Sequence, residues 1–296
     1  MTINYNSPLS LRSFLEQEGL GMQKKFGQNF LINQRIRETL ADSLGAEKGS
    51  EVWEIGPGLG AMTEILLNRE LNVKAFEIDA GFIRVLKNIF SGRENFQLIE
   101  GDVMKTWPEQ PPSDFLFGNL PYNIAAALIA DLIEKERVFS RMIITVQKET
   151  AQRMIAAPGT KDYSSFTVLC ASVYSVKPVV LIKPEAFYPQ PNVDSMGVLL
   201  ENKNLPCYPK IFYPLVRSLF ASRRKTIKNN LTGFIASRFN FEHCKGIPER
   251  HTAKLSAQDA CAEVLRDNGL SGMERAETLE HQTFLSLAKS LENMRL

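Results

Sequence analysis

The sequence predicts an α/β protein: a doubly wound, mostly parallel sheet with antiparallel edge strands, followed by a small all-helical C-terminal domain. Three observations support this prediction. From about residue 33, short apolar runs alternate with amphipathic segments, which is the pattern of strands joined by helical crossovers. A glycine-rich turn links the apolar run 51–55 to the helix that follows it. Beyond residue 204, every segment has the spacing of a helix.

Five apolar runs are predicted to form the parallel strands. Most are followed by a segment with apolar residues at helical spacing, as at Phe82, Ile83, Leu86 and Ile89. This alternation favours right-handed crossovers within one sheet. The predicted strands are EVWEI (51–55), VKAFEI (73–78), FQLIE (96–100), DFLFG (114–118) and MIITV (142–146).

The pattern changes after Gln147. We expect a helix carrying Lys148 and Arg153, and then an apolar helix near residues 165–174. Two further strands, VKPVVLIKP and VDSMGVLLE, are joined by the loop EAFYPQPN and are predicted to form an antiparallel edge pair. The polar segment NKNLPCYPK (202–210) is a plausible linker. The predicted domains are therefore 1–204 and 205–296.

Composition narrows the classes of function. The chain has 296 residues, of which 44% are hydrophobic and 23% charged, and no apolar run has the length of a membrane span. The N-terminus lacks a secretory pattern, and the four cysteines are scattered without a C-x-x-C pair. We therefore expect a cytoplasmic protein with reduced thiols. The three histidines lack metal-ligand spacing, so no metal is expected.

The glycine-rich turn EIGPGLG (54–60) is a candidate ligand loop. It stands between a predicted strand and a helix, and its glycines allow a ligand to press against the backbone. Glu77 ends the next strand, 21 residues after Gly56, where a carboxylate can bind ribose hydroxyls. The G-x-G-x-G spacing with Pro57 favours a nucleoside without phosphates over a dinucleotide. The alternative is a turn that binds nothing.

Asp102 follows the third predicted strand and faces the same crevice. Its carboxylate can accept a hydrogen bond from an adenine amino group, although a lone aspartate here is also typical of a helix N-cap.

The stretch FGNLPYNI (117–124) closes the fourth strand. The lone pair of an adenine amino group is delocalised into the ring, which makes the nitrogen a poor nucleophile. The Asn119 side-chain oxygen and the Leu120 carbonyl, fixed by Pro121, can accept both N–H bonds and aim that lone pair at an electrophile. Tyr122 supplies a flat face for an unstacked base. The alternative is a simple proline turn over a packed tyrosine.

Two other segments carry candidate residues. In QKKFGQNFL (23–31), Lys24 and Lys25 can meet phosphate, while Asn29 and Leu31 can fold over the crevice as a lid; the alternative is a solvated basic arm. In EAFYPQPNVDS, Phe187 offers a second aromatic face for the base, or else it covers the core.

The C-terminal part is the basic one. The net charge of the chain is +2, yet residues 205–296 hold 14 Lys and Arg against 9 Asp and Glu. The stretch RSLFASRRKTIKNNL (217–231) is predicted to be one basic amphipathic helix, with Arg217, Arg224 and Lys228 on one face and Phe220, Ile227 and Leu231 on the other. Five cations within twelve residues, without an acid, favour phosphate contacts over a solvated surface.

These motifs together resemble the ribosomal RNA adenine dimethyltransferase family, in its bacterial small-subunit group. The resemblance runs from QKKFGQNFL through EIGPGLG, NLPYNI, FYPQPNVDS and FASRRKTIKNNL to the closing RAETLEHQTFLSLAKSL. It implies a Rossmann-like, S-adenosylmethionine-dependent methyltransferase. It also implies dimethylation at N6 of two adjacent adenosines in the 3′-terminal hairpin loop of 16S rRNA, with a role in small-subunit biogenesis.

The resemblance also assigns site residues. It places donor binding at Asn29, Leu31, Gly56, Glu77, Asp102 and Asn119. It places the catalytic contacts to the target base at Asn119, Leu120, Tyr122 and Phe187. The expected RNA contacts are Lys24, Lys25, Arg223, Arg224, Lys225 and Lys228. The expected partner is 16S rRNA in the 30S subunit or its precursor, bound by a monomer without a membrane or an obligate protein partner. The loop YPQPN departs from the PPPK-like sequences usual in the family.

Three rivals stay open at this point. A large-subunit rRNA methyltransferase of the antibiotic-resistance type shares the donor site, but lacks the full-length match. DNA adenine and protein glutamine methyltransferases use a related turn, usually with Pro in place of Leu. A non-catalytic RNA-binding or ribosome-assembly factor is expected to have lost the donor loop or Asn119, and both are present.

Overall fold

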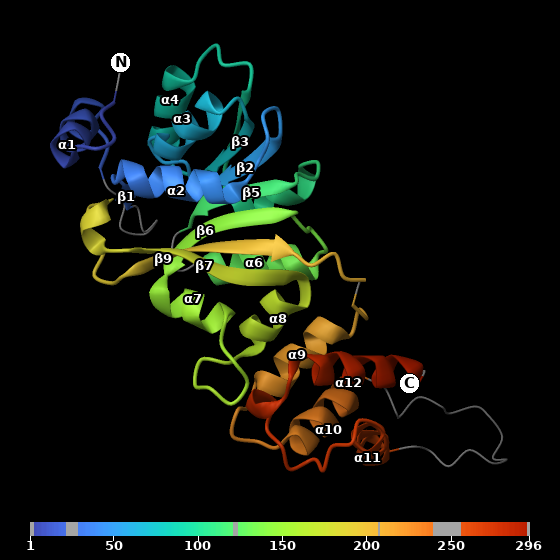
Figure 1. Ribbon diagram of the computed structural model, residues 1–296. Helices are drawn as coiled ribbons and strands as arrows, with labels where there is room; N and C mark the ends of the chain where they lie inside the picture. The colour runs from blue at the N-terminus through green and yellow to red at the C-terminus, as the bar shows by residue number, and fades with distance from the viewer. Residues whose placement is uncertain (1–2, 22–28, 121–123, 207, 239–255, 295–296) are drawn as a thin grey trace. The chain divides into compact units, whose positions relative to one another are not determined.

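The computed structural model describes residues 3–21, 29–120, 124–206, 208–238 and 256–294 (Figure 1). The chain divides into two compact units, Met1–Gln152 with Val173–Lys203, and Arg153–Ser172 with Asn204–Leu296. The segment 153–172 lies inside the first predicted domain, but by its contacts it groups with the C-terminal helices. The boundaries 1–204 and 205–296 remain predictions for the functional domains.

The first unit contains a seven-stranded sheet in the order β4-β3-β2-β5-β6-β9-β7. The strands from β4 to β6 run parallel, while β9 pairs antiparallel with β6 and with β7. The predicted α/β class, with its antiparallel edge, is therefore confirmed. The strands are β2 (Glu51–Ile55), β3 (Asn72–Glu77), β4 (Phe96–Glu100), β5 (Phe115–Asn119), β6 (Arg141–Gln147), β7 (Tyr174–Ile182) and β9 (Ser195–Asn202).

Helices cover the sheet on both faces. The helices α2 (Gln34–Leu44), α3 (Ala61–Asn68) and α4 (Ala80–Ile89) share one core cluster with the sheet. The chain then returns past β2 to form β5, and right-handed crossovers place α6 (Ala125–Glu134) on the opposite face, behind the sheet in Figure 1. The short α5 spans Val103–Thr106. The reversal of strand order between β2 and β5 creates a crevice at their carboxyl ends.

An N-terminal helix and a two-stranded ribbon were not expected from the sequence. Helix α1 (Pro8–Gln17) begins after Ser7, whose side chain accepts a hydrogen bond from the Ser10 N–H. Its apolar face packs into a cluster that includes Leu59 and Phe82. The ribbon pairs β1 (Phe30–Leu31) antiparallel with β8 (Phe187–Tyr188). Strands of two residues have no detectable periodicity, which is why the sequence did not reveal them.

The second unit is helical. Its core includes apolar residues of α9 (Phe212–Phe220), α10 (Ile227–Arg238), α11 (Ala257–Asp267) and α12 (His281–Asn293), joined by the 3-10 turn η4 (Ala276–Thr278). Two helices, α7 (Lys148–Met154) and α8 (Ser165–Val173), lie where the chain passes between the units. Within the described residues, no helix combines the length and apolar content needed to cross a bilayer.

The predicted single helix over 217–231 is wrong. Helix α9 ends at Phe220 and α10 begins at Ile227, so Arg223, Arg224 and Lys225 lie on the turn between them. Asn230 stabilises the break, because its Nδ2 donates to the carbonyl oxygens of Leu219 (2.9 Å) and Ser222 (3.2 Å) near the end of α9. The cations of this segment therefore do not share one helical face.

Candidate functional site

A pocket of about 330 Å³ lies at the carboxyl ends of β2 and β5. This is the switch point of the doubly wound sheet, where such folds bind their ligands. The structure brings together all six predicted donor-binding residues in its lining: Asn29, Leu31, Gly56, Glu77, Asp102 and Asn119.

The glycine loop forms the floor of the pocket with an unusual backbone. Gly56, Gly58 and Gly60 have φ angles of +70°, +58° and +89°, which side chains other than glycine rarely adopt. A Cβ atom at Gly58 would stand 3.0 Å from Cε1 of Phe30, so the ring of Phe30 lies directly over the loop. The loop therefore needs glycine both for its backbone conformation and for the close approach of Phe30, which lines the same pocket.

Glu77 ties the glycine loop to the end of β3. Its Oε2 accepts from the Gly58 N–H at 3.0 Å, and its Oε1 accepts from the N–H groups of Ile78 and Asp79, both at 2.9 Å. Burial raises the pKa of Glu77 to about 7, although these backbone donors pull the pKa downward. The carboxylate therefore organises the loop as well as facing the pocket.

Two further acids line the same pocket. Burial raises the pKa of Glu54, on β2, to about 8. Asp102 caps α5, because its Oδ1 accepts from the Met104 N–H at 3.0 Å. It therefore has the N-cap role and also lines the pocket.

Arg37 is the one cation among the described lining residues, and its guanidinium donates to the Leu31 carbonyl and to the Asn6 side chain. Such a lining suits a positively charged nucleoside and disfavours phosphate.

Asn119 stands where β5 ends, beside the glycine loop. Its Nδ2 donates to the Asn29 carbonyl at 3.0 Å, and its Oδ1 accepts from the Thr145 hydroxyl at 2.7 Å. Leu120 has a buried side chain, and a Cβ at Gly118 would lie 2.8 Å from its Cδ2, which explains the glycine before Asn119. Tyr122, Lys24 and Lys25 lie outside the described residues.

Phe187 has a different environment from the one that a base-stacking residue needs. Its side chain is 2% exposed and packs in the core cluster that includes Leu31 and Leu199. It is absent from the described pocket lining, although β8 pairs its backbone with Leu31, which lines the pocket. In this structure Phe187 therefore covers the core, which was the alternative interpretation of this aromatic residue. The role of Phe187 at the target base remains a prediction.

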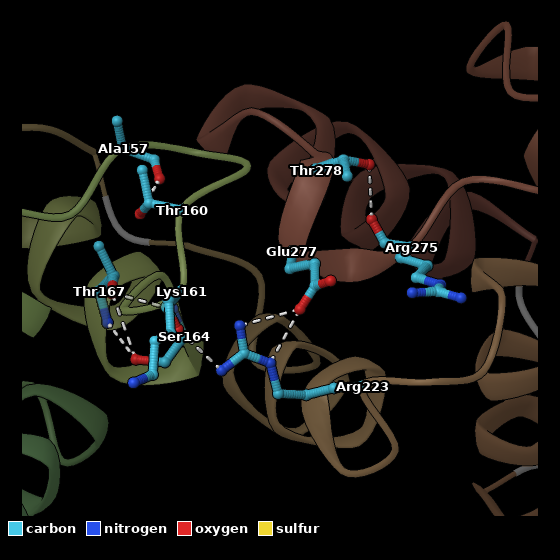
Figure 2. A network of polar contacts seen from close by, with 9 residues as sticks. All are labelled: Ala157, Thr160, Lys161, Ser164, Thr167, Arg223, Arg275, Glu277 and Thr278. Carbon is cyan, nitrogen blue, oxygen red and sulfur yellow. Dashed lines mark hydrogen bonds and ion pairs between the residues drawn. The ribbon is translucent and has the colours of Figure 1, made fainter.

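The predicted basic residues divide into two kinds. Arg223 bridges three segments of the second unit: its Nε and Nη2 bind Glu277 Oε2 at 2.9 and 2.8 Å, and its Nη1 donates to the Lys161 carbonyl at 3.1 Å (Figure 2). Arg224, Lys225 and Lys228 are exposed and form no ion pair within the described part of the chain. These three cations, unlike Arg223, are available to an anionic partner.

Sequence reasoning missed four residues around the pocket. Phe30 covers the glycine loop, Arg37 supports Leu31, and Thr145 bonds Asn119. Tyr5 lines the pocket, and its hydroxyl donates to the Leu59 carbonyl in the glycine loop at 2.9 Å. Phe30 stands between Asn29 and Leu31 in the stretch QKKFGQNFL, and Thr145 is polar within an apolar strand, so these two left a usable signal; Tyr5 and Arg37 belong to no short motif with a known mechanism.

The fold and this pocket define an S-adenosylmethionine-dependent methyltransferase. Two solved structures have the same architecture. A dimethyladenosine transferase from Plasmodium falciparum matches with a TM-score of 0.76 and 26% identity, over 89% of this chain and 98% of that one. The 23S rRNA methyltransferase ErmE has a TM-score of 0.61 at 21% identity, over 88% and 99%, and shares the fold.

The chain belongs to the ribosomal RNA adenine dimethylase family, whose model matches residues 19–266. A ribosomal RNA small subunit methyltransferase A from Treponema denticola is 47% identical over 294 residues, covering 96% of this chain and 94% of that protein. A protein of the same name from Shouchella clausii is 31% identical, over 96% and 95%. The predicted enzyme class, a methyltransferase that dimethylates rRNA adenine with S-adenosylmethionine, is confirmed.

Donor affinity is expected to depend on pH. Glu77 and Glu54 have pKa values raised to about 7 and about 8, and a bound cation favours their ionised forms. Affinity for S-adenosylmethionine should therefore rise as the pH increases from about 6 to about 9. Calorimetric titration across this range measures it. S-adenosylhomocysteine, which lacks the sulfonium charge, should give a shallower dependence, and equal slopes for the two ligands would contradict the prediction.

Replacing Tyr5 with Phe is expected to weaken donor binding about three- to tenfold, since one hydrogen bond to the glycine loop is lost. Titration with S-adenosylmethionine measures the change. Arg12→Ala is the matched control, because Arg12 lies on the solvent side of the same N-terminal segment. An equal loss in both variants would mean that the whole segment, and not the Tyr5 bond, was disturbed.

Proposed function

We propose that this protein transfers methyl groups from S-adenosylmethionine to N6 of two adjacent adenosines in the 3′-terminal hairpin loop of 16S rRNA, dimethylating both. The single observation that carries the choice of subunit is the 47% identity, over 96% of the chain, to a relative named for the small subunit. We further propose that it acts in the cytoplasm as a monomer, on the 30S subunit or its precursor, with a role in subunit biogenesis.

The donor would be held by the residues that line the pocket. Glu77 offers its carboxylate to the ribose, Asp102 faces the adenine amino group, and Gly56 lets the backbone approach. Asn29 and Leu31 close the pocket from the β1 side, supported by Arg37. When bound, S-adenosylmethionine supplies the methyl group on a sulfonium centre, which gives the acidic lining its electrostatic purpose.

Asn119 would position the acceptor. Its Oδ1 accepts one bond from Thr145 and retains a second lone pair for an N–H of the target amino group. The Leu120 carbonyl would accept the other N–H, so that the nitrogen lone pair points at the methyl group. Tyr122 and Phe187 would hold the base, as the family resemblance implies. This arrangement needs neither a metal nor a covalent enzyme intermediate.

The test is mass spectrometry of rRNA after the protein has been incubated with S-adenosylmethionine and unmethylated small subunits. We expect two N6,N6-dimethyladenosines in the fragment that contains the 3′-terminal hairpin. In a parallel incubation with large subunits, methylation of large-subunit rRNA in place of this fragment would point to the antibiotic-resistance type of enzyme. Binding to subunits without any methyl transfer would favour a non-catalytic assembly factor. Sedimentation at the mass of one 33.3 kDa chain checks the monomer.

A further inference from the structure

The Asn119 amide is bonded at both ends by the protein itself. Thr145 lies on β6, directly opposite Asn119 in the register of β5 and β6, and is only 1% exposed. Its hydroxyl stands 2.7 Å from Asn119 Oδ1 and 3.4 Å from the Gly118 carbonyl. A hydroxyl has one proton to donate, and the shorter contact is the stronger bond. On the other side, Asn119 Nδ2 donates to the Asn29 carbonyl.

The Asn29 carbonyl, which can only accept, selects one of the two orientations of the amide, and the Thr145 hydroxyl then holds Oδ1 in place. If the amide turned over, Oδ1 would face the Asn29 carbonyl, which is a repulsive contact between two acceptors. Thr145 would then accept from Nδ2, and its own proton would have only the 3.4 Å contact with the Gly118 carbonyl. The observed orientation leaves the second lone pair of Oδ1 as the remaining hydrogen-bonding capacity on that atom.

The hydroxyl of Thr145 is unusual in β6, because the residues next to it along the strand are apolar. The neighbouring residues along β6 are Met142, Ile143, Ile144 and Val146, all buried and apolar. Valine has the shape of threonine without the hydroxyl, and would suit a buried strand at least as well. The hydroxyl is therefore explained by its bond to Asn119 and not by packing.

We propose that Thr145 is a positioning residue for methyl transfer, which fixes the Asn119 amide with its oxygen presented to the target amino group. This inference rests on the proposed function of Asn119. Thr145 does not touch the reacting atoms, and acts only through the orientation of that side chain. It predicts an effect on the rate of the chemical step, with little effect on donor affinity.

The experiment compares Thr145→Val with Thr145→Ser in the full-length protein. The valine variant is expected to lower kcat about tenfold, which corresponds to the loss of one hydrogen bond in the transition state, while the Kd for S-adenosylmethionine stays within about twofold. The serine variant keeps the hydroxyl and should restore most of kcat. Ile143→Val, on the same strand, is the control for a general disturbance of the sheet.

A second measurement does not depend on the rRNA target. In protein labelled with ¹⁵N-asparagine, the side-chain amide signal of Asn119, identified by its loss in Asn119→Asp, should be protected from hydrogen exchange in the wild type and in Thr145→Ser. Protection should be lost in Thr145→Val. Full kcat with unchanged protection in the valine variant would overturn the proposal, as would a defect that serine fails to restore. Inactivity of the wild type on small subunits would overturn the proposed target, and the amide signal would still decide the role of Thr145.

Discussion

Asn119→Ala is expected to lower methyl transfer to small-subunit rRNA by about 100-fold or more, because the target amino group loses the acceptor that orients it. S-adenosylmethionine should still bind, with reduced affinity, since Asn119 also lines the donor pocket and bonds Asn29. Single-turnover methylation and calorimetric donor binding, measured on one preparation, separate these two effects.

The control for this experiment is Asn88→Ala, which removes an exposed asparagine from α4. It should leave both the methylation rate and the donor affinity unchanged. Near-normal turnover of Asn119→Ala would remove Asn119 from the mechanism, and with it the proposed role of Thr145.

Reversing charges on the turn between α9 and α10 is expected to separate residues that bind the small subunit from a residue that stabilises the fold. Arg224→Glu with Lys225→Glu should weaken binding to small subunits and lower the slope of log affinity against log salt by about 2, since two phosphate contacts are lost. Melting temperature should not change, because both side chains are exposed and form no ion pair within the described residues.

Arg223→Glu should behave differently. It breaks the bond to Glu277 and places two acids side by side, so we expect the melting temperature to fall by about 2–4 °C. A Lys210→Glu, Lys289→Glu double variant changes the net charge by the same amount as the Arg224, Lys225 pair. If it weakened subunit binding equally, total charge and not this turn would be the cause.

The sequence predicted those elements of the fold whose hydrophobic pattern extends over many residues. The strands of the sheet carry continuous apolar runs, and Gly56, Glu77 and Asp102 stand at strand ends, where the topology must bring them together. The predicted helix over 217–231 was wrong because helical spacing in that stretch masked a break. The break depends on Asn230, whose side chain bonds carbonyls eight and eleven residues earlier.

Features that depend on a single distant contact were beyond the sequence. Thr145 meets Asn119 only because β5 and β6 are neighbours in register, and Tyr5 reaches the glycine loop across 54 residues of chain. The environment of Phe187 likewise depends on its pairing with Leu31 in a ribbon of two residues per strand. Local sequence patterns contain no information about such contacts. The aromatic character of Phe187 suited both of its possible roles, stacking on the target base and covering the core.

The β1–β8 ribbon bears on how one base can receive two methyl groups. Dimethylation consumes two donor molecules in succession, so the spent donor must leave and a fresh one must enter between the two transfers. Residues 29–31 line the donor pocket, bond Asn119 through the Asn29 carbonyl, and pair with Phe187. Any movement of this segment that opens the donor pocket therefore also loosens the groups assigned to the acceptor. Exchange of the donor and positioning of the acceptor are thus mechanically coupled through residues 29–31.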